Sequence, residues 1–220
     1  EAVQNSCNPA FIMIGQKIGK ERFLKNIRAF GFFEETGIEL PGETTGVGFT
    51  EDKFTDVDLA TSSFGQSITV TPLQMITAVS AVANGGTLYK PHLVKEIVNS
   101  DSIVVEKNEP ETVRQVISEE TSKTMCSILE SVVSKGGGKN AYLAGYRVAG
   151  KTGTSEKYPR GNSKYVASFI GFAPADDPEV LAIAIIHNPQ GVYYGGQVAA
   201  PVVRQLFENV LPYLDKMDYN

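Results

Sequence analysis

The chain has 220 residues, of which 42% are apolar, and a net charge of −5 with histidine neutral. This length fits one domain, with or without a small appendage, and the apolar fraction excludes a disordered chain. Mild acidity without a Lys/Arg cluster argues against a nucleic-acid binder, because phosphate backbones require concentrated positive charge. No apolar run approaches the roughly 20 residues that span a bilayer.

The first half of the sequence predicts helices around a long irregular stretch. Asn8 followed by Pro9 predicts an N-cap and a first helical position, and apolar residues at helical spacing continue to Ile18. A second helix is expected over about residues 21–30. Residues 34–64 show no period and include loop chemistry, which favours a functional or surface-wrapping segment.

The middle of the chain predicts one more capped helix, a hairpin and a long helix. Thr71 and Pro72 form a second N-cap and first-position pair, and the helix ends at residues 84–86, Asn-Gly-Gly. The other two elements are a small hairpin of residues 92–98 and 102–106, and a long amphipathic helix that is capped by Ser118 and ends at residues 136–138, Gly-Gly-Gly.

Three strands and a final helix are expected in the last third, at residues 146–154, 165–173, 179–187 and 198–211. The longest apolar run, residues 180–186, is apolar on both faces, which predicts a central strand covered by helices on both sides. A central strand needs a neighbour on each edge. Residues 165–173 supply one, and no other strong strand is left, because 146–154 should pair across 165–173.

A missing strand and the first residue lead to the same expectation about the chain. It begins with Glu1 rather than Met and has no signal peptide. An unpaired apolar edge is an aggregation hazard. We therefore expect at least one sheet strand before residue 1, in a longer protein of which this chain is a piece.

Cysteine and histidine give little guidance. Cys7 and Cys126 could form one disulfide, but their spacing does not show it. With His92 and His187 they are four candidate ligands, none in a local metal-binding pair, so we expect no zinc site and no cofactor.

The most specific feature is the run Lys151, Thr152, Gly153 and Thr154 at a strand edge. Gly153 has no side chain, so a substrate can approach the backbone closely. Lys151 offers an ammonium, the threonines offer hydroxyls, and the strand edge offers N–H groups to a carbonyl oxygen. K-T-G belongs with S-x-x-K and S-D-N in the signature of class A β-lactamases and penicillin-binding proteins.

A second, weaker motif is Ser6-Cys7-Asn8, which fits S-x-N with Cys in the place of Asp. Ser and Asn are common, so the motif has little weight alone, and Asn8 before Pro9 is also explained as a helix cap. Its position favours the functional interpretation, because it opens a helix and precedes K-T-G by a long interval.

Taken together, these segments resemble the C-terminal part of the transpeptidase domain of class B penicillin-binding proteins, most closely the division and sporulation transpeptidases of the stage V sporulation protein D type. The resemblance covers essentially the whole chain. It extends over residues 6–11, 37–43, 63–66, 71–74, 150–154 and 193–196.

The resemblance implies an α/β fold in which an antiparallel sheet is flanked by helices on both faces, incomplete at its N-terminal side. Residues 1–220 would be the C-terminal portion of one such domain. The family's nucleophile is the serine of S-x-x-K, and this chain contains no S-x-x-K. The nucleophile and one or more strands would therefore lie upstream of residue 1.

The implied activity is serine acyl transfer between peptidoglycan stem peptides, which β-lactams trap. Ser6 would pass a proton to the leaving amine, Asn8 would orient the missing lysine and the substrate amide, and Lys151 would hold Ser6. Thr152 and Thr154 would bind the substrate carboxylate, the Thr154 N–H would supply half of an oxyanion hole, and Gly65 with Gln66 would shape the floor.

The same resemblance implies an ectodomain outside the cytoplasmic membrane, anchored far upstream, with a membrane glycosyltransferase as partner of the longer protein. Two alternatives remain open. One is a non-catalytic scaffold in a division or sporulation complex, against which the retained Ser6, Asn8 and Lys151 count. The other is a β-lactamase or carboxypeptidase, which the class B-like segments disfavour.

Overall fold

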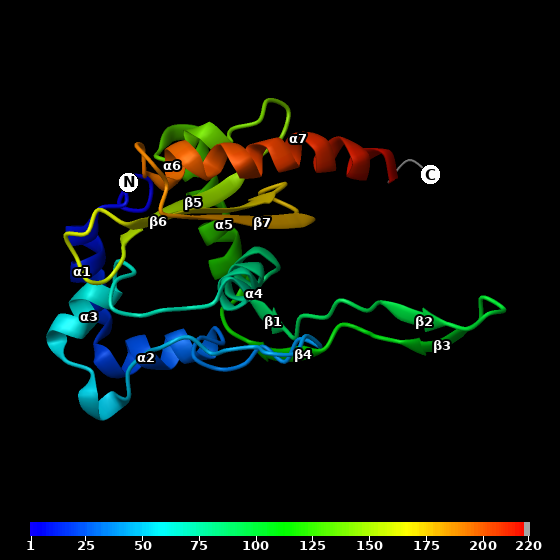
Figure 1. Ribbon diagram of the computed structural model, residues 1–220, viewed down its shortest axis with the longest axis horizontal. Helices are drawn as coiled ribbons and strands as arrows, with labels where there is room; N and C mark the ends of the chain where they lie inside the picture. The colour runs from blue at the N-terminus through cyan, green and yellow to red at the C-terminus, as the bar shows by residue number, and fades with distance from the viewer. Residues whose placement is uncertain (218–220) are drawn as a thin grey trace. The chain divides into compact units, whose positions relative to one another are not determined.

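The computed structural model describes residues 1–217, which form two compact units (Figure 1). Unit 1 comprises residues 1–13 together with the chain from residue 120 onward, and unit 2 comprises residues 14–119. Among residues 1–217, no helix combines the length and the apolar character that crossing a membrane requires.

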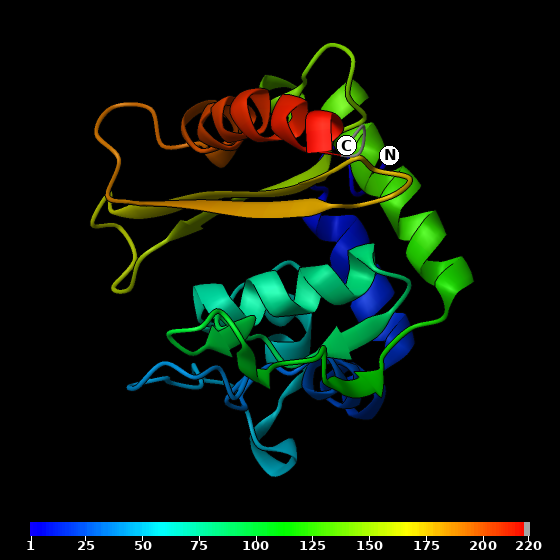
Figure 2. The same ribbon diagram turned by 90° about the vertical axis from the view of Figure 1, so that its right-hand side faces the viewer.

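Unit 1 is built on an antiparallel sheet of three strands in the order β5-β6-β7 (Figure 2). The strands are β5 (Ala149–Glu156), β6 (Tyr165–Ala173) and β7 (Val180–His187). The predicted order is confirmed, with Lys151 opposite Ile170 and Ile170 opposite Ile183. The first strand begins at Ala149 rather than at residue 146, because Tyr146 instead turns back to form an isolated bridge with Leu143.

The helices of unit 1 are α5 (Glu119–Lys135), the short η2 (Lys139–Ala141), α6 (Gly195–Val198) and α7 (Ala200–Met217). The long helix predicted after Ser118 is confirmed. The helix expected over 198–211 is confirmed as α7, which begins at Ala200 and continues to Met217, and the short α6 before it was not predicted. Helix α7 packs along one face of the sheet (Figure 1), and the core between them contains the fully buried Phe169 and Phe207.

Strand β7 has apolar residues on both faces, as the sequence predicts. Val180, Ala182, Ala184 and Ile186 pack against the core beneath α7. Side chains alternate along a strand, so Leu181, Ile183 and Ile185 face the opposite side, where they are half-buried. Within residues 1–217 the strand that pairs with β7 is β6, and a second neighbour remains a prediction.

The predicted helices at the start of the chain and at residues 72–83 are confirmed. They are α1 (Asn8–Ile18), α2 (Lys20–Ala29) and α4 (Pro72–Ala83). In α4 the Thr71 side chain accepts from the Gln74 N–H, and the Gln74 side chain accepts from the Thr71 N–H, so the capping box fixes the start of the helix.

The absence of regular structure predicted for residues 34–64 is wrong in part. This segment contains η1 (Glu51–Lys53) and α3 (Asp56–Ser62). A capping box between Thr55 and Asp58 starts α3, and Leu59 packs with Phe54 and Leu24 in a buried cluster. A seven-residue helix held by its cap and one buried apolar side chain is too short to show a period.

Unit 2 contains two small antiparallel pairs. The predicted hairpin is confirmed in shorter form, as β2 (Glu96–Val98) with β3 (Val104–Lys107). The pair of β1 (Thr87–Tyr89) with β4 (Thr112–Gln115) was not predicted. Strands of three or four residues are too short to show alternation, and their partners lie far apart in the sequence.

Both cysteines are free. Cys7 is exposed and Cys126 is buried in α5, where burial raises the pKa of its thiol. Neither thiol contributes a cross-link to the fold.

We expect the Phe207→Ala substitution to destabilise unit 1 by about 3–5 kcal/mol, because it leaves a cavity under α7 where a fully buried ring now packs. The neighbouring Leu206, which is 43% exposed, gives the control Leu206→Ala. Denaturant unfolding of the two variants measures the difference. Equal losses of unfolding free energy would contradict this assignment of the core.

Candidate active site

The two sequence motifs meet in unit 1. Strand β5 carries Lys151, and the segment before α1 carries Ser6, which is 145 positions away in sequence. The Lys151 ammonium donates a hydrogen bond to the Ser6 hydroxyl and a second one, of 2.9 Å, to the carbonyl oxygen of Thr152. The predicted pairing of Lys151 with Ser6 is therefore present in the structure.

Lys151 is half-buried, and burial lowers the pKa of its ammonium from the usual lysine value. The partners just described are uncharged oxygens, so they do not neutralise the ammonium. A desolvated cation beside a hydroxyl can polarise that hydroxyl and attract an anionic group.

The segment that carries Ser6 is held by the end of α5. The Gly137 N–H donates to the Gln4 carbonyl oxygen over 3.2 Å. A Cβ at Gly136 would lie only 2.7 Å from the same oxygen, so the two backbones are in close contact. Ser6 itself has a φ of 48°, a conformation that few residues other than glycine adopt. The surrounding segment therefore fixes the Ser6 hydroxyl in an uncommon backbone geometry.

The cap predicted at Asn8 is wrong by one position. The Phe11 N–H donates to the Cys7 carbonyl, which makes Cys7 the N-cap and Asn8 the first residue of α1. Asn8 is exposed, two residues after Ser6. The capping explanation of Asn8 therefore does not hold, and its side chain is left for another role.

Thr154 is tied to the start of α6. Its hydroxyl accepts a 3.0 Å hydrogen bond from the Gly195 N–H. A Cβ at Gly195 would lie 2.3 Å from the Gly153 carbonyl oxygen and 2.2 Å from that of Ser168, so only glycine fits. Gly195 lies outside the two sequence motifs and was not predicted as a site residue. The available signal was its place in the Tyr-Tyr-Gly-Gly run of residues 193–196.

Gly153 lies opposite Ser168 in the β5–β6 register. A Cβ there would come 2.5 Å from the Ser168 hydroxyl, so glycine at this position permits close packing within the sheet. Thr152 is half-buried and Thr154 is exposed. The predicted run Lys151–Thr154 therefore lies on one strand, with its last hydroxyl at the helix start.

Gly65 and Gln66 lie in unit 2, in a turn after α3 where Gly65 has a φ of 87°. The Gly65 N–H donates to the Ser62 carbonyl and the Gln66 N–H to that of Thr61. Their expected place at the floor of the site remains a prediction.

Metal ligands do not cluster in the part of the chain that the structure describes: no three His, Cys, Asp or Glu residues there are placed to hold an ion. The groups brought together around Lys151 are hydroxyls, one ammonium and backbone amides. Such a set suits acyl transfer and the binding of an anion.

Residues 1–208 match the family described as the penicillin binding protein transpeptidase domain. Stage V sporulation protein D of Bacillus subtilis is 48% identical over 219 residues, covering 97% of this chain and 34% of that protein. Peptidoglycan D,D-transpeptidase FtsI of Escherichia coli K12 is 32% identical, covering 95% of this chain and 34% of that protein. The chain thus spans about a third of these relatives.

Solved structures give the same result for the fold. Penicillin binding protein 3 of Mycobacterium tuberculosis in complex with aztreonam has a TM-score of 0.88 and 30% identity, covering 97% of this chain and 51% of that one. The transpeptidase domain of Burkholderia pseudomallei penicillin-binding protein 3 has a TM-score of 0.85 and 29% identity, covering 97% and 63%. The fold is thus part of the penicillin-binding protein transpeptidase fold, as the sequence predicts.

The family match extends from residue 1 through both motif-bearing segments, and the fold of the chain agrees with that of solved members. The chain belongs to the penicillin-binding protein transpeptidase family, in its class B branch.

Proposed function

We propose that this chain is part of a peptidoglycan D,D-transpeptidase that cross-links stem peptides through a serine acyl-enzyme. The observation that carries the proposal is the hydrogen bond from Lys151 to Ser6, which joins the K-T-G and S-x-N motifs in one site. Splitting one amide exchange into two acyl transfers makes each step easier.

Each site residue has a proposed task. Ser6, polarised by Lys151, passes a proton to the leaving D-alanine amine, and Asn8 orients the substrate amide and the lysine of S-x-x-K. Thr152 and Thr154 bind the terminal carboxylate next to the Lys151 cation. The Thr154 N–H and the N–H of the nucleophile form the oxyanion hole. Gly65 and Gln66 are proposed to shape the floor of the active site.

The nucleophile and a neighbour for β7 are proposed to lie in a segment of the protein that precedes residue 1. Two observations support this. The sequence contains no S-x-x-K, and Leu181, Ile183 and Ile185 leave β7 with a half-buried apolar face. Residues 1–220 would then be the C-terminal portion of one transpeptidase domain.

The longer protein would act in cell division or sporulation, as the names of its relatives indicate. Its ligands would be stem peptides and β-lactams, since solved members of the family are complexed with aztreonam and ampicillin. We place the domain on the outer face of the cytoplasmic membrane, anchored by an upstream segment, with a membrane glycosyltransferase as partner.

A non-catalytic scaffold in the same assembly is the second candidate. It would account for the fold, but it needs neither Lys151 nor Ser6. The half-buried position of Lys151 argues against it, because desolvating a cation is costly and a docking surface gains nothing from it. Labelling by penicillin separates the two candidates.

We expect this chain alone to form no covalent adduct with a fluorescent penicillin, and the protein extended by its upstream segment to become labelled. Gel fluorescence and mass spectrometry measure both. An adduct on any residue of this chain would contradict the proposed place of the nucleophile. An extended, folded protein that stays unlabelled would favour the scaffold.

In the extended protein, Lys151→Met should slow acylation by penicillin roughly 10²-fold or more, because Ser6 loses its polarising partner and the carboxylate its cation. The wild-type rate should fall at high pH as Lys151 loses its proton. Since burial lowers this pKa, the alkaline limb should lie below the pKa of an ordinary lysine. Stopped-flow acylation from pH 6 to 11 measures both effects.

The exposed Lys123 of α5 supplies the matched control, Lys123→Met, which removes one cation at a distance from the site. Its rate and its alkaline limb should equal those of the wild type. If Lys151→Met kept the wild-type rate and limb, Lys151 would have no part in acylation.

A further inference from the structure

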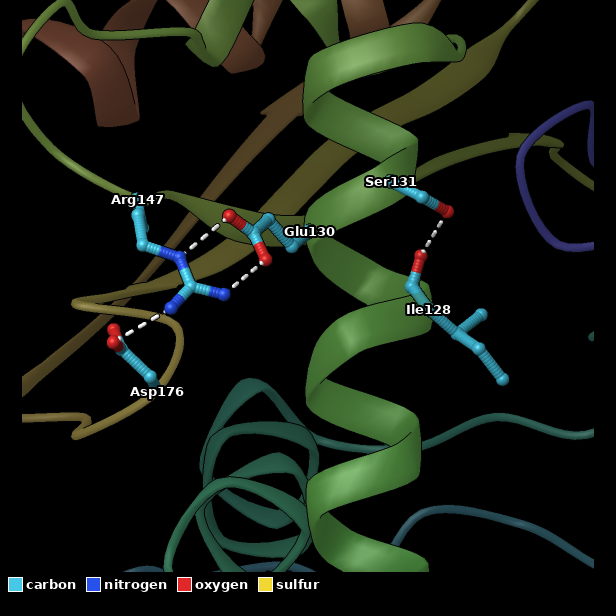
Figure 3. A network of polar contacts seen from close by, with 5 residues as sticks. All are labelled: Ile128, Glu130, Ser131, Arg147 and Asp176. Atoms are coloured by element: carbon cyan, nitrogen blue, oxygen red, sulfur yellow. Dashed lines mark hydrogen bonds and ion pairs between the residues drawn. The ribbon is translucent and has the colours of Figure 1, made fainter.

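Arg147 connects three segments of unit 1 (Figure 3). Its Nε and one terminal nitrogen donate to the two carboxylate oxygens of Glu130 in α5, over 2.8 and 2.7 Å. The other terminal nitrogen donates to Asp176, in the turn between β6 and β7, over 2.6 Å. The Arg147 carbonyl also accepts from the Ala175 N–H over 2.7 Å. Both the side chain and the backbone of Arg147 are therefore fixed.

The contact with Glu130 is a forked pair, which fixes orientation as well as distance because both groups are planar. Arg147 and Asp176 are more than half exposed, so their contribution to stability is small. The Glu130 side chain is only 25% exposed, and the Arg147 hydrogen bond lowers its pKa, which keeps the carboxylate ionised near neutral pH. The pair is better suited to alignment than to stabilisation.

Helix α5 connects Glu130 to the segment that carries Ser6. Glu130 lies in the same helix that ends at Lys135. Directly after the helix, the Gly137 N–H binds the carbonyl of Gln4, two residues before Ser6. The close contact between Gly136 and Gln4 leaves no room for these backbones to slide past each other. A rotation of α5 would therefore move Ser6.

Strand β5 connects Arg147 to Lys151. Arg147 directly precedes Val148 and β5, whose residues pair one-for-one with β6 from Ala149 onward. Lys151 is four positions after Arg147, and it lies in this strand. Two contacts thus connect α5 and the segment it holds to β5 and the residues before it. One is the Lys151–Ser6 hydrogen bond, and the other is the Arg147–Glu130 pair.

We propose that Arg147 is a positioning residue, which holds α5 in register with β5 through Glu130 and so keeps the Ser6 hydroxyl against the Lys151 ammonium. Arg147 touches neither of these two side chains. The alignment itself does not depend on the proposed function, whereas its consequence for acyl transfer rests on it.

The test compares Arg147→Met, Arg147→Lys and Glu130→Gln in the protein that contains this chain. Trace labelling with acetic anhydride, quantified by mass spectrometry across pH, gives the apparent pKa of the Lys151 amine. In all three variants that pKa should rise toward the ordinary lysine value, because the displacement of Ser6 leaves the Lys151 amine more exposed to water. The control is Arg204→Met, which breaks the 2.8 Å pair of the similarly exposed Arg204 with Glu208 in α7 and should cause no shift.

Electrostatics alone predicts a different pattern. Removing the Glu130 charge without moving Lys151 would lower the pKa of the ammonium, and Arg147→Lys would leave it unchanged. If Arg147 is a positioning residue, the pKa of Lys151 rises in both Glu130→Gln and Arg147→Lys. A lower pKa of Lys151 in Glu130→Gln, or an unchanged pKa in Arg147→Lys, overturns the proposal. Melting curves measure whether the variants are folded. If Arg147→Met does not fold, Glu130→Gln and Arg147→Lys are sufficient for the test.

A second readout separates this proposal from the proposed function. In the extended protein, displacement of Ser6 by about 1 Å should slow acylation at saturating penicillin by up to about 10²-fold, while the penicillin concentration for half-saturation stays the same. A wild-type protein that is never acylated would refute the proposed function and leave the labelling test of Arg147 intact. Unchanged acylation in all three variants would refute the positioning role.

Discussion

The hydrogen bond between Lys151 and Ser6 is the contact on which the geometry of the candidate site depends. It joins the first residues of the chain to a strand near the middle of unit 1, and it requires a half-buried cation. Such a cation is stable only if the groups around it are fixed in advance, because oxygens that must rearrange cannot replace its lost water. Much of the local architecture can be understood as a way of fixing those groups.

Three glycine residues help to hold the groups around Lys151 in place. Gly136, Gly153 and Gly195 each lie where a Cβ would come within 3 Å of another residue's oxygen. They allow other groups to approach the main chain closely at these positions. Nearby N–H groups then make connections, from Gly137 to the Gln4 carbonyl and from Gly195 to the Thr154 hydroxyl. A main-chain donor has no rotamers to lose, so these connections hold the site residues at little cost in conformational entropy.

The sequence predicted those parts of the fold that have a long run of apolar residues or a strong helix cap. Residues 165–173 form a long run rich in aromatic and β-branched residues, and Thr71 with Pro72 marks a helix start. It did not predict α3 or the β1–β4 pair, which are short and are stabilised by a cap or by a distant partner. In the site, the motifs identified Lys151 and Ser6, but they could not identify Gly195, whose role depends on a fold-level contact with Thr154.

The same distinction explains why the motifs themselves are insufficient. Lys151 and Ser6 could be recognised because they lie in the K-T-G and S-x-N motifs. The residues that bring them together, Gln4, Gly137 and the Glu130–Arg147 pair, have ordinary chemistry and act through where they are held. A site assembled from segments 145 residues apart needs such supports on both sides, because a hydrogen bond tolerates only a few tenths of an ångström of error. The motif residues determine which reaction the site can perform, and the supporting residues determine whether it is assembled.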